Sequence, residues 1–284
     1  MKALVTGGCG FIGSNLVDKL IDLGYQVLVI DDLSAGKREH CNNAAEYVFK
    51  DFKEELENNK DEMIDVIFHL AANARIQPSF DNPLYTCKNN SYGCAIVADF
   101  ARNSNARVVY AGSSSFYNGA FLNPYSFSKW QGEDVFKMYS KIYDLDVGTA
   151  RFFNVYGPRN PLIGQYTPVV AIFEEQLKEN KPLTIVGDGD QRRDFTHVYD
   201  ICQGLISISK KSFKGEVFNL GTGINYSINE LADMFGGVKQ YITARPGEGR
   251  TTLADISRTT ELTGWKPQYN LADYIKDFLT QISK

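Results

Sequence analysis

The chain has 284 residues, which is enough for a nucleotide-binding domain with a smaller second lobe, and its 43% hydrophobic content is that of a globular protein. A net charge of -4 with scattered basic residues argues against a nucleic-acid-binding surface. No run of about eighteen apolar residues occurs, so no membrane-spanning helix is predicted.

The five cysteines are odd in number and form no Cys-x-x-Cys pair, which favours a reducing compartment. The N-terminal residues enter an apolar strand directly, without the features of a secretion signal. We therefore expect a soluble, cytoplasmic protein. His69 and His197 are expected to be structural, and no His, Cys and carboxylate spacing predicts a metal site.

Short apolar runs bounded by turns alternate with amphipathic segments of helical length in the first half of the chain. Strands that are apolar on both faces and separated by helices indicate a parallel sheet covered on both sides. We therefore predict an α/β fold with a doubly wound parallel sheet of the Rossmann type. The predicted strands are 3–6, 26–30, 66–70, 107–111 and 146–152.

After Asn154 the pattern changes to segments that carry Gly and Pro, separated by isolated helical stretches at 168–179 and 229–235. This change predicts a smaller, discontinuous C-terminal substrate lobe. We assign 1–155 to the dinucleotide-binding domain, with 196–222 returning to it through a helix at 198–210. The nucleotide-sugar-binding lobe then comprises 156–195 and 223–284.

A glycine-rich turn joins the first predicted strand to a helix at 14–23. Gly7 and Gly10 allow the backbone to turn tightly beside a pyrophosphate, and Gly13 allows the helix to pack closely on the strand. The second strand ends at Asp31, eighteen residues beyond Gly13, where a carboxylate accepts hydrogen bonds from ribose hydroxyls. The sequence thus favours NAD, while the nearby Lys37 and Arg38 leave NADP open.

Tyr125 and Lys129 are four residues apart, so on a helix they share one face. A neighbouring ammonium group stabilises phenolate, and we expect Lys129 to lower the pKa of Tyr125. Such a phenol can remove a proton from a substrate hydroxyl while hydride leaves the same carbon. The pair predicts a general base.

The motifs TGGCGFIGSNL, HLAAN, AGSSSFY, YSFSK and RFFNVYGPR follow one another along the chain. In this order the chain resembles the extended short-chain dehydrogenase/reductase superfamily, in its NAD-dependent nucleotide-sugar epimerase branch, of the UDP-glucose/UDP-N-acetylglucosamine 4-epimerase type. VGDGDQRRDFTHVYDI, FNLGTG and RPGEGRTTLADISRTTELTGWKP extend the resemblance to the C-terminus.

The resemblance implies Ser113, Tyr125 and Lys129 as catalytic residues, although the serine run would allow Ser114 to take the place of Ser113. Asn90 resembles a residue near the nicotinamide, but a buried polar residue satisfying a helix is an open alternative. The implied substrate-binding residues are Ser113, Asn154, Arg193, Arg245, Glu248 and Thr252, of which the two arginines would clamp a diphosphate. The implied cofactor-binding residues are Gly7, Gly10, Phe11, Ile12, Gly13, Asp31, Asp32, Ser34, Asp51, Phe52, Leu70, Ala71, Ala72, Asn90, Tyr125 and Lys129.

The two residues after Ser113 select among the reactions of this branch. The resemblance implies acidic side chains there in dehydratases, and usually a glutamate at the second position in decarboxylases, whereas Ser114 and Ser115 cannot transfer that proton. We therefore expect epimerisation at C4 of a UDP-sugar through a transient 4-keto intermediate. A 2-epimerase, another nucleotide diphosphate, a reductase using NAD(P)H and a non-catalytic nucleotide-binding sensor remain alternatives.

The chain also departs from the family pattern. Ser113 and Tyr125 are only twelve positions apart, and Asn118 to Ala120 replace a longer loop that usually covers the sugar site. The shorter loop could open the pocket. Thr252 predicts room for an N-acetyl group, and Asn73, Arg75 and Gln77 add polar groups near the expected sugar. Helices predicted at 84–102 and 126–143 could form a homodimer interface or pack on the sheet.

Overall fold

The structure is a computed structural model that describes residues 1–59, 62–74, 76–161, 167–244, 246–247 and 249–282. A seven-stranded sheet occupies the first part of the molecule, with the strand order β10-β6-β5-β4-β1-β2-β3 and parallel pairing throughout. Its strands are β1 (Lys2–Thr6), β2 (Gln26–Ile30), β3 (Glu46–Val48), β4 (Val66–His69), β5 (Arg107–Ser113), β6 (Val147–Phe152) and β10 (Lys214–Leu220). The predicted doubly wound fold is confirmed.

Two strands of this sheet escaped prediction, β3 and β10, and both lie at its edges. β3 has three residues and none of them is buried, so it lacks an apolar run. β10 begins with the charged residues Lys214 and Glu216 and is only half-buried over most of its length. Edge strands face solvent on one side, which removes the apolar pattern that identifies central strands.

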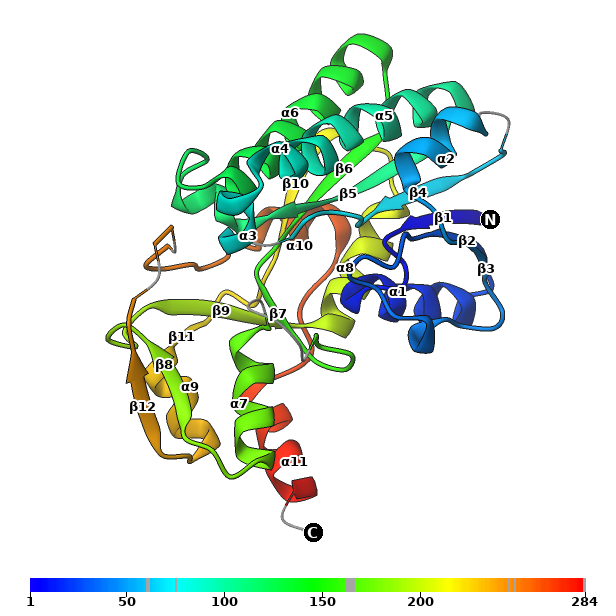
Figure 1. Cartoon of the computed structure of the whole chain (residues 1–284). Helices are drawn as coiled ribbons and strands as arrows, with labels where there is room; N and C mark the ends of the chain where they lie inside the picture. Colours follow the sequence, from blue (N-terminus) through cyan, green and yellow to red (C-terminus); the bar gives the residue numbers. More distant parts are fainter. Residues whose placement is uncertain (60–61, 75, 162–166, 245, 248, 283–284) are drawn as a thin grey trace.

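Helices cover both faces of the sheet (Figure 1). On one face, α1 (Phe11–Asp22) and α8 (Val198–Ser209) pack in a core with Ala3 and Val5 of β1. On the other face, Leu4 packs in a second core that includes α2 (Phe52–Asn58), α5 (Gly93–Ser104) and α6 (Pro124–Tyr143). The alternation of Ala3, Leu4 and Val5 between the two cores follows from the two-residue period of a strand.

The segment predicted as one helix at 84–102 contains an irregular turn. It begins as α4 (Pro83–Cys87), continues as a π-helical turn η2 (Lys88–Tyr92), and ends as α5. The π-helical turn is a local widening that the periodicity of the sequence does not reveal, and such turns are frequent at functional sites.

A second layer of smaller sheets follows. β11 (Asn225–Ser227), β9 (Arg192–His197) and β7 (Asn154–Tyr156) form one sheet, and β12 (Lys239–Ile242) and β8 (Leu183–Val186) form another. They share a third core with α7 (Val169–Lys178), α9 (Ile228–Phe235) and α11 (Leu271–Ile282). The remaining elements are η1 (Arg38–His40), α3 (Ile76–Asp81), η3 (Ser114–Asn118) and α10 (Ser257–Thr263).

The chain passes between the layers more than once. β10 pairs with β6 in the large sheet, and Trp265 packs in the core shared by α1 and α8. The Trp265 indole nitrogen donates a hydrogen bond to the carbonyl oxygen of Asp200 at 2.9 Å. The exact domain boundaries stay a prediction.

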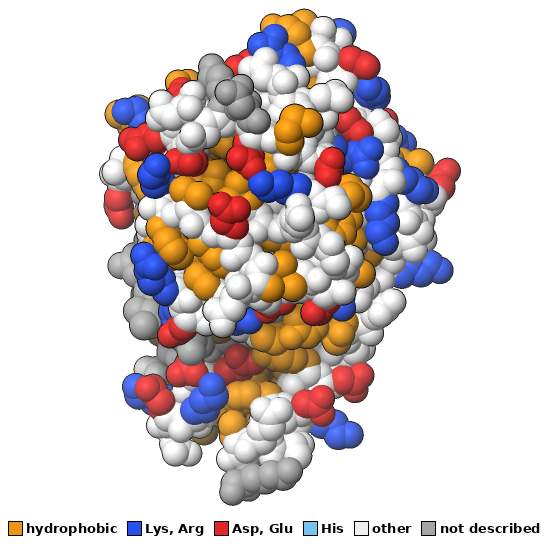
Figure 2. Space-filling view, turned by 90° about the vertical axis from the view of Figure 1, so that its right-hand side faces the viewer, with side chains coloured by type: hydrophobic (Ala, Val, Ile, Leu, Met, Phe, Trp, Pro, Cys, Tyr) orange, Lys and Arg blue, Asp and Glu red, His pale blue; other side chains and the backbone are white. Residues whose placement is uncertain are grey.

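Among the described residues, no helix is both long and apolar enough to cross a membrane. On the face drawn in Figure 2, Lys and Arg side chains are interspersed with Asp and Glu side chains, and neither sign forms a continuous stripe.

Candidate active site

The glycine turn between β1 and α1 is shaped by close approaches of backbone to backbone. Gly7 has a φ of +74°, and a Cβ there would lie 2.8 Å from the Ala71 nitrogen. A Cβ on Gly13 would lie 2.1 Å from the Gly7 carbonyl oxygen. No side chain caps α1 at Gly10, and the first turn carries no acidic residue. The amides at this helix end are therefore suited to a phosphate group.

Asp31 holds this turn from the end of β2. Its carboxylate accepts hydrogen bonds from the backbone nitrogens of Cys9 at 2.9 Å and Leu33 at 2.8 Å. Burial raises the pKa of Asp31, against the two hydrogen bonds, which act to lower it. Asp31 is 7% exposed and lines the cavity, where a ribose hydroxyl can donate a hydrogen bond to its side chain.

A cavity of about 950 Å³ extends from the glycine turn past the end of β5 to β9, which is large for a small-molecule site. The residues of the predicted site that line it are Gly7, Gly10, Phe11, Ile12, Gly13, Asp31, Asp32, Ser34, Asp51, Phe52, Leu70, Ala71, Ala72, Ser113, Tyr125, Lys129, Asn154, Arg193 and Thr252. The structure thus brings most of that site together around one space. Arg75, Arg245 and Glu248 lie outside the described residues.

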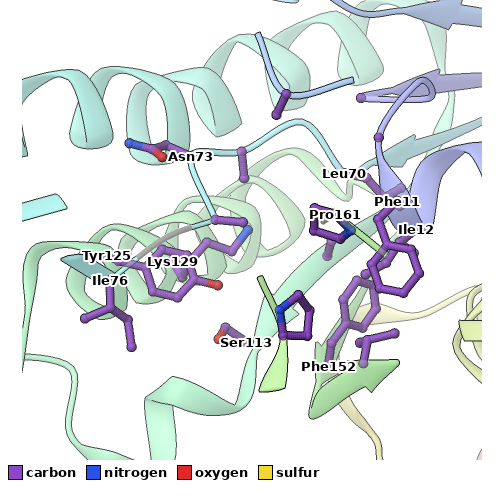
Figure 3. Close-up of a pocket in the computed structure, with 18 of the residues that line it drawn as sticks. Phe11, Ile12, Leu70, Asn73, Ile76, Ser113, Tyr125, Lys129, Phe152 and Pro161 are labelled. Carbon is purple, nitrogen blue, oxygen red and sulfur yellow. The ribbon is translucent and has the colours of Figure 1, made fainter. Parts of the chain in front are cut away.

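Ser113, Tyr125 and Lys129 meet in the middle of this cavity. Ser113 is the last residue of β5, while Tyr125 and Lys129 project from α6, whose first turn is capped by the Asn123 side chain accepting from the Ser126 nitrogen at 2.8 Å. Figure 3 shows the Tyr125 and Lys129 side chains beside one another and the Ser113 side chain near the phenol oxygen. The i, i+4 spacing of Tyr125 and Lys129 therefore predicts the correct arrangement of the pair.

The expectation that Lys129 lowers the pKa of Tyr125 is wrong. Burial raises the pKa of Tyr125, and the opposing effect comes from a hydrogen bond with Ser113 rather than from the ammonium group. The Lys129 nitrogen lies over the Tyr110 ring, 4.4 Å from its centroid. Burial lowers the pKa of Lys129 to about 8, although Cys94 and Glu133 act to raise it. For both Tyr125 and Lys129, burial has the largest effect on the pKa, and burial cannot be read from the sequence.

The backbone fixes the orientation of Ser113. Its Oγ accepts a hydrogen bond from the Ser115 nitrogen at 3.2 Å, so the hydroxyl proton is free to be donated. The hydrogen bond between Ser113 and Tyr125 favours Ser113 over Ser114 as the residue that accompanies the base. The catalytic assignment of Ser113 stays a prediction.

Asn90 does not line the cavity, contrary to its assignment to the cofactor site. It is 1% exposed, and its side chain bonds to both the nitrogen and the carbonyl oxygen of Asn73, at 2.8 and 3.1 Å. It also donates to Ser128 Oγ at 3.0 Å. Asn90 therefore takes the alternative role of a buried polar residue that joins η2 to α6 and to the Asn73 backbone.

The sequence analysis did not identify two other residues of the cavity wall. These are His40, near Asp31, and Gly249, which lies against Asn118. A polar residue in a short loop gives no sign of its partner in the sequence, because that partner lies far away in the chain. In the described part of the chain, no group of three His, Cys, Asp or Glu side chains is placed to hold a metal ion.

The phosphate-binding turn, the acidic end of β2 and the Ser-Tyr-Lys group at one cavity define a dinucleotide-dependent enzyme of the short-chain dehydrogenase type. Residues 3–221 match the model of the NAD dependent epimerase/dehydratase family. The chain belongs to this family. The predictions of family, of an enzyme and of NAD as its cofactor are confirmed.

Individual relatives span the whole chain. The UDP-glucose 4-epimerase of Mycolicibacterium smegmatis is 35% identical over 305 residues, covering 97% of this chain and 96% of the relative. The crystal structure of UDP-glucose 4-epimerase from Thermotoga maritima with UDP-glucose superimposes with a TM-score of 0.93 at 30% identity, covering 100% of both chains. The structure of a UDP-N-acetylglucosamine 4-epimerase from Methanobrevibacter ruminantium in complex with UDP-N-acetylmuramic acid superimposes with a TM-score of 0.89 at 31% identity. The superposition covers 99% of this chain and 98% of the relative.

Proposed function

We propose that this protein epimerises a UDP-sugar at C4, using NAD that is regenerated in each turnover. The observation that carries the proposal is the complete group of Ser113, Tyr125 and Lys129, in which Ser113 is followed directly by two more serines. Ser114 and Ser115 supply no acid or base for elimination, which leaves oxidation and its reversal. The similarity to 4-epimerases over the whole chain supports this reading.

The residues of the chain have distinct roles in this reaction. Tyr125 takes the proton of the C4 hydroxyl, and Ser113 donates a hydrogen bond to the C4 oxygen. NAD, when bound, supplies a hydride acceptor and later the hydride donor. The 4-keto sugar rotates about its diphosphate linkage while the diphosphate is held. Tyr125 then returns its proton to the C4 oxygen. Arg193 is suited to hold the diphosphate, because it lines the cavity on the side away from the glycine turn.

The burial of Tyr125 has a consequence for this scheme. A phenol with a raised pKa is a poor base, so positive charge must favour the phenolate when the reaction begins. Lys129 supplies part of that charge while it remains protonated, below its pKa of about 8.

A test of the proposal is incubation with a panel of nucleotide sugars, with the products resolved by NMR. We expect interconversion of C4 epimers without net consumption of NAD, and we expect Tyr125→Phe to abolish it while cofactor binding persists. Stoichiometric oxidation of NADPH would instead identify a reductase, and inversion at C2 would identify a 2-epimerase. Turnover retained by Tyr125→Phe would remove this residue from the mechanism.

The assembly and the location are further parts of the proposal. Leu84, Tyr92 and Ile142 are 66%, 57% and 62% exposed, and they lie on α4, η2 and α6. Exposed apolar side chains on neighbouring helices support a homodimer formed through this face. The five cysteines are free thiols, which supports a cytoplasmic location. Light scattering tests the first, and fluorescent tagging of the chain in its host cell tests the second.

A further inference from the structure

The segment around Pro246 and Gly247 is fastened to the layer that carries the catalytic residues. Gln77 Nε2 donates to the Pro246 carbonyl oxygen at 3.0 Å, and Asn123 Nδ2 donates to the Gly247 carbonyl oxygen at 3.1 Å. Asn123 is also the residue that caps α6. One side chain therefore connects the start of the catalytic helix to a segment more than a hundred residues away.

The same segment continues toward the substrate side of the cavity. The Arg250 carbonyl oxygen accepts from the Arg192 nitrogen at 3.0 Å, and the Thr252 nitrogen donates to the Arg192 carbonyl oxygen at 3.1 Å. The described residues from Pro246 to Thr252 are thus held at one end by the catalytic layer and at the other by β9. Gly249 lies between these attachments.

Asn118, the first residue of the shortened loop, lies directly against Gly249. A Cβ at position 249 would lie 2.1 Å from Asn118 Cγ and 2.3 Å from Nδ2, so only glycine fits under this amide as it stands. Both residues line the cavity that contains Ser113 and Tyr125. The opening expected from the shorter loop is therefore covered here by Asn118 and a distant segment of the same chain.

The Asn118 amide is also free to bind a ligand. Among the described residues its side chain has no hydrogen-bond partner, and it is only partly buried. An amide offers a donor and an acceptor, which suits a sugar hydroxyl or an acetamido group. Asn118 follows Ser113 by five residues, so the η3 turn that positions the catalytic serine also carries this amide.

We propose that Asn118 is a specificity-determining residue of the sugar subsite. Resting on Gly249, its amide closes the side of the cavity that the shortened loop leaves uncovered, and it hydrogen bonds to a hydroxyl group of the sugar. This inference rests on the proposed function and assigns a determinant of its substrate choice. The size of the substituent that is admitted then depends on the pair of residues at 118 and 249, rather than on Thr252 alone.

The test uses Asn118→Ala, Gly249→Ala and the double variant, each assayed with a plain UDP-hexose and its 2-acetamido counterpart. Asn118→Ala enlarges the subsite and removes the hydrogen bond to the hydroxyl of the plain sugar, and we expect the kcat/KM ratio to shift by about three- to tenfold toward the acetamido sugar, the effect of about one hydrogen bond. Gly249→Ala pushes the amide into the cavity and should shift the ratio the opposite way. In the double variant the alanine at 249 has room, and the ratio should return toward that of the wild type.

Binding of the two sugars to the same variants in a Tyr125→Phe background, with NAD present, gives a readout that does not depend on turnover. The affinity for NAD should be unchanged, because neither residue 118 nor residue 249 packs against the glycine turn. An active wild type whose ratio moves by less than about twofold in both single variants would overturn this inference alone, since a hydrogen bond is worth more than that. A wild type inactive on every nucleotide sugar would overturn the proposed function and this inference with it.

Discussion

Glu133 and Arg151 form a buried ion pair between α6 and β6, with Arg151 Nη2 2.6 Å from Glu133 Oε2 and side chains 7% and 1% exposed for Arg151 and Glu133 respectively. Arg151 Nε donates to both carboxylate oxygens, at 3.0 and 3.2 Å. The guanidinium also stacks on the Phe116 ring, 3.6 Å from its centroid, and lies 5.0 Å from that of Tyr117. The pair therefore connects the helix of Tyr125 and Lys129 to the turn that follows Ser113.

Removing one partner of this pair should cost more than removing both. Glu133→Gln leaves the Arg151 charge buried without a counter-charge, and we expect the free energy of unfolding to fall by about 3 kcal/mol or more. A Glu133→Leu, Arg151→Met double variant exchanges the pair for apolar side chains and should be more stable than Glu133→Gln. Urea unfolding followed by circular dichroism measures both. Equal losses in the two variants would show that the ion pair is not what stabilises this contact.

The buried Lys129 should make stability depend on pH in a defined window. Its pKa is about 8 in the folded protein, against an ordinary value of 10.5 that applies to the unfolded chain. Between these values the unfolded state binds more protons, so the unfolding free energy rises with pH, by at most about 1.4 kcal/mol per pH unit. Subtracting the unfolding free energy of Lys129→Met at each pH removes the contribution of the other titratable groups. The unfolding free energy of the wild type should rise relative to that of the variant from pH 8 to 10.5, and a difference that does not change with pH would contradict the lowered pKa of Lys129.

The fold was predictable where burial imposes a pattern along the chain. The central strands of the large sheet are apolar on both faces, and the glycine turn must follow the first of them, so both could be located from residue types. β3 and β10 could not, because an edge strand does not require an apolar run. The π-helical turn at Lys88–Tyr92 likewise left no periodic sign.

The sequence predicted which residues form the site better than it predicted their pKa values. Spacing along α6 placed Tyr125 beside Lys129, but the pKa of each depends on how much protein surrounds it, and burial is a tertiary property. Asn90 was ambiguous for the same reason, since the sequence does not show whether a polar side chain faces a ligand or the protein backbone. The contact between Asn118 and Gly249 joins positions 131 residues apart and has no local signature.

Asp31 should control the choice between NAD and NADP. Its carboxylate is buried beside the adenosine end of the cavity and would oppose a 2′-phosphate by charge. Asp31→Asn keeps an oxygen that can accept from the Cys9 nitrogen or the Leu33 nitrogen but removes the charge. We expect the affinity for NAD to fall and that for NADP to fall less or to rise. Calorimetric titration with each cofactor measures this, and an equal loss for both would assign Asp31 to loop structure alone.

The serine run provides a matched pair of variants for the catalytic assignment. Ser113→Ala removes the hydroxyl that hydrogen bonds to Tyr125, and the pKa of the phenol should then rise further, because that hydrogen bond acts to lower it. The rising limb of the pH profile of kcat should move to higher pH, and kcat should fall by about a hundredfold, as for other donors to a reacting oxygen. Ser114→Ala, one residue along and equally buried, should leave the profile in place. A larger loss in Ser114→Ala than in Ser113→Ala would show that the catalytic hydroxyl lies one position further along the chain.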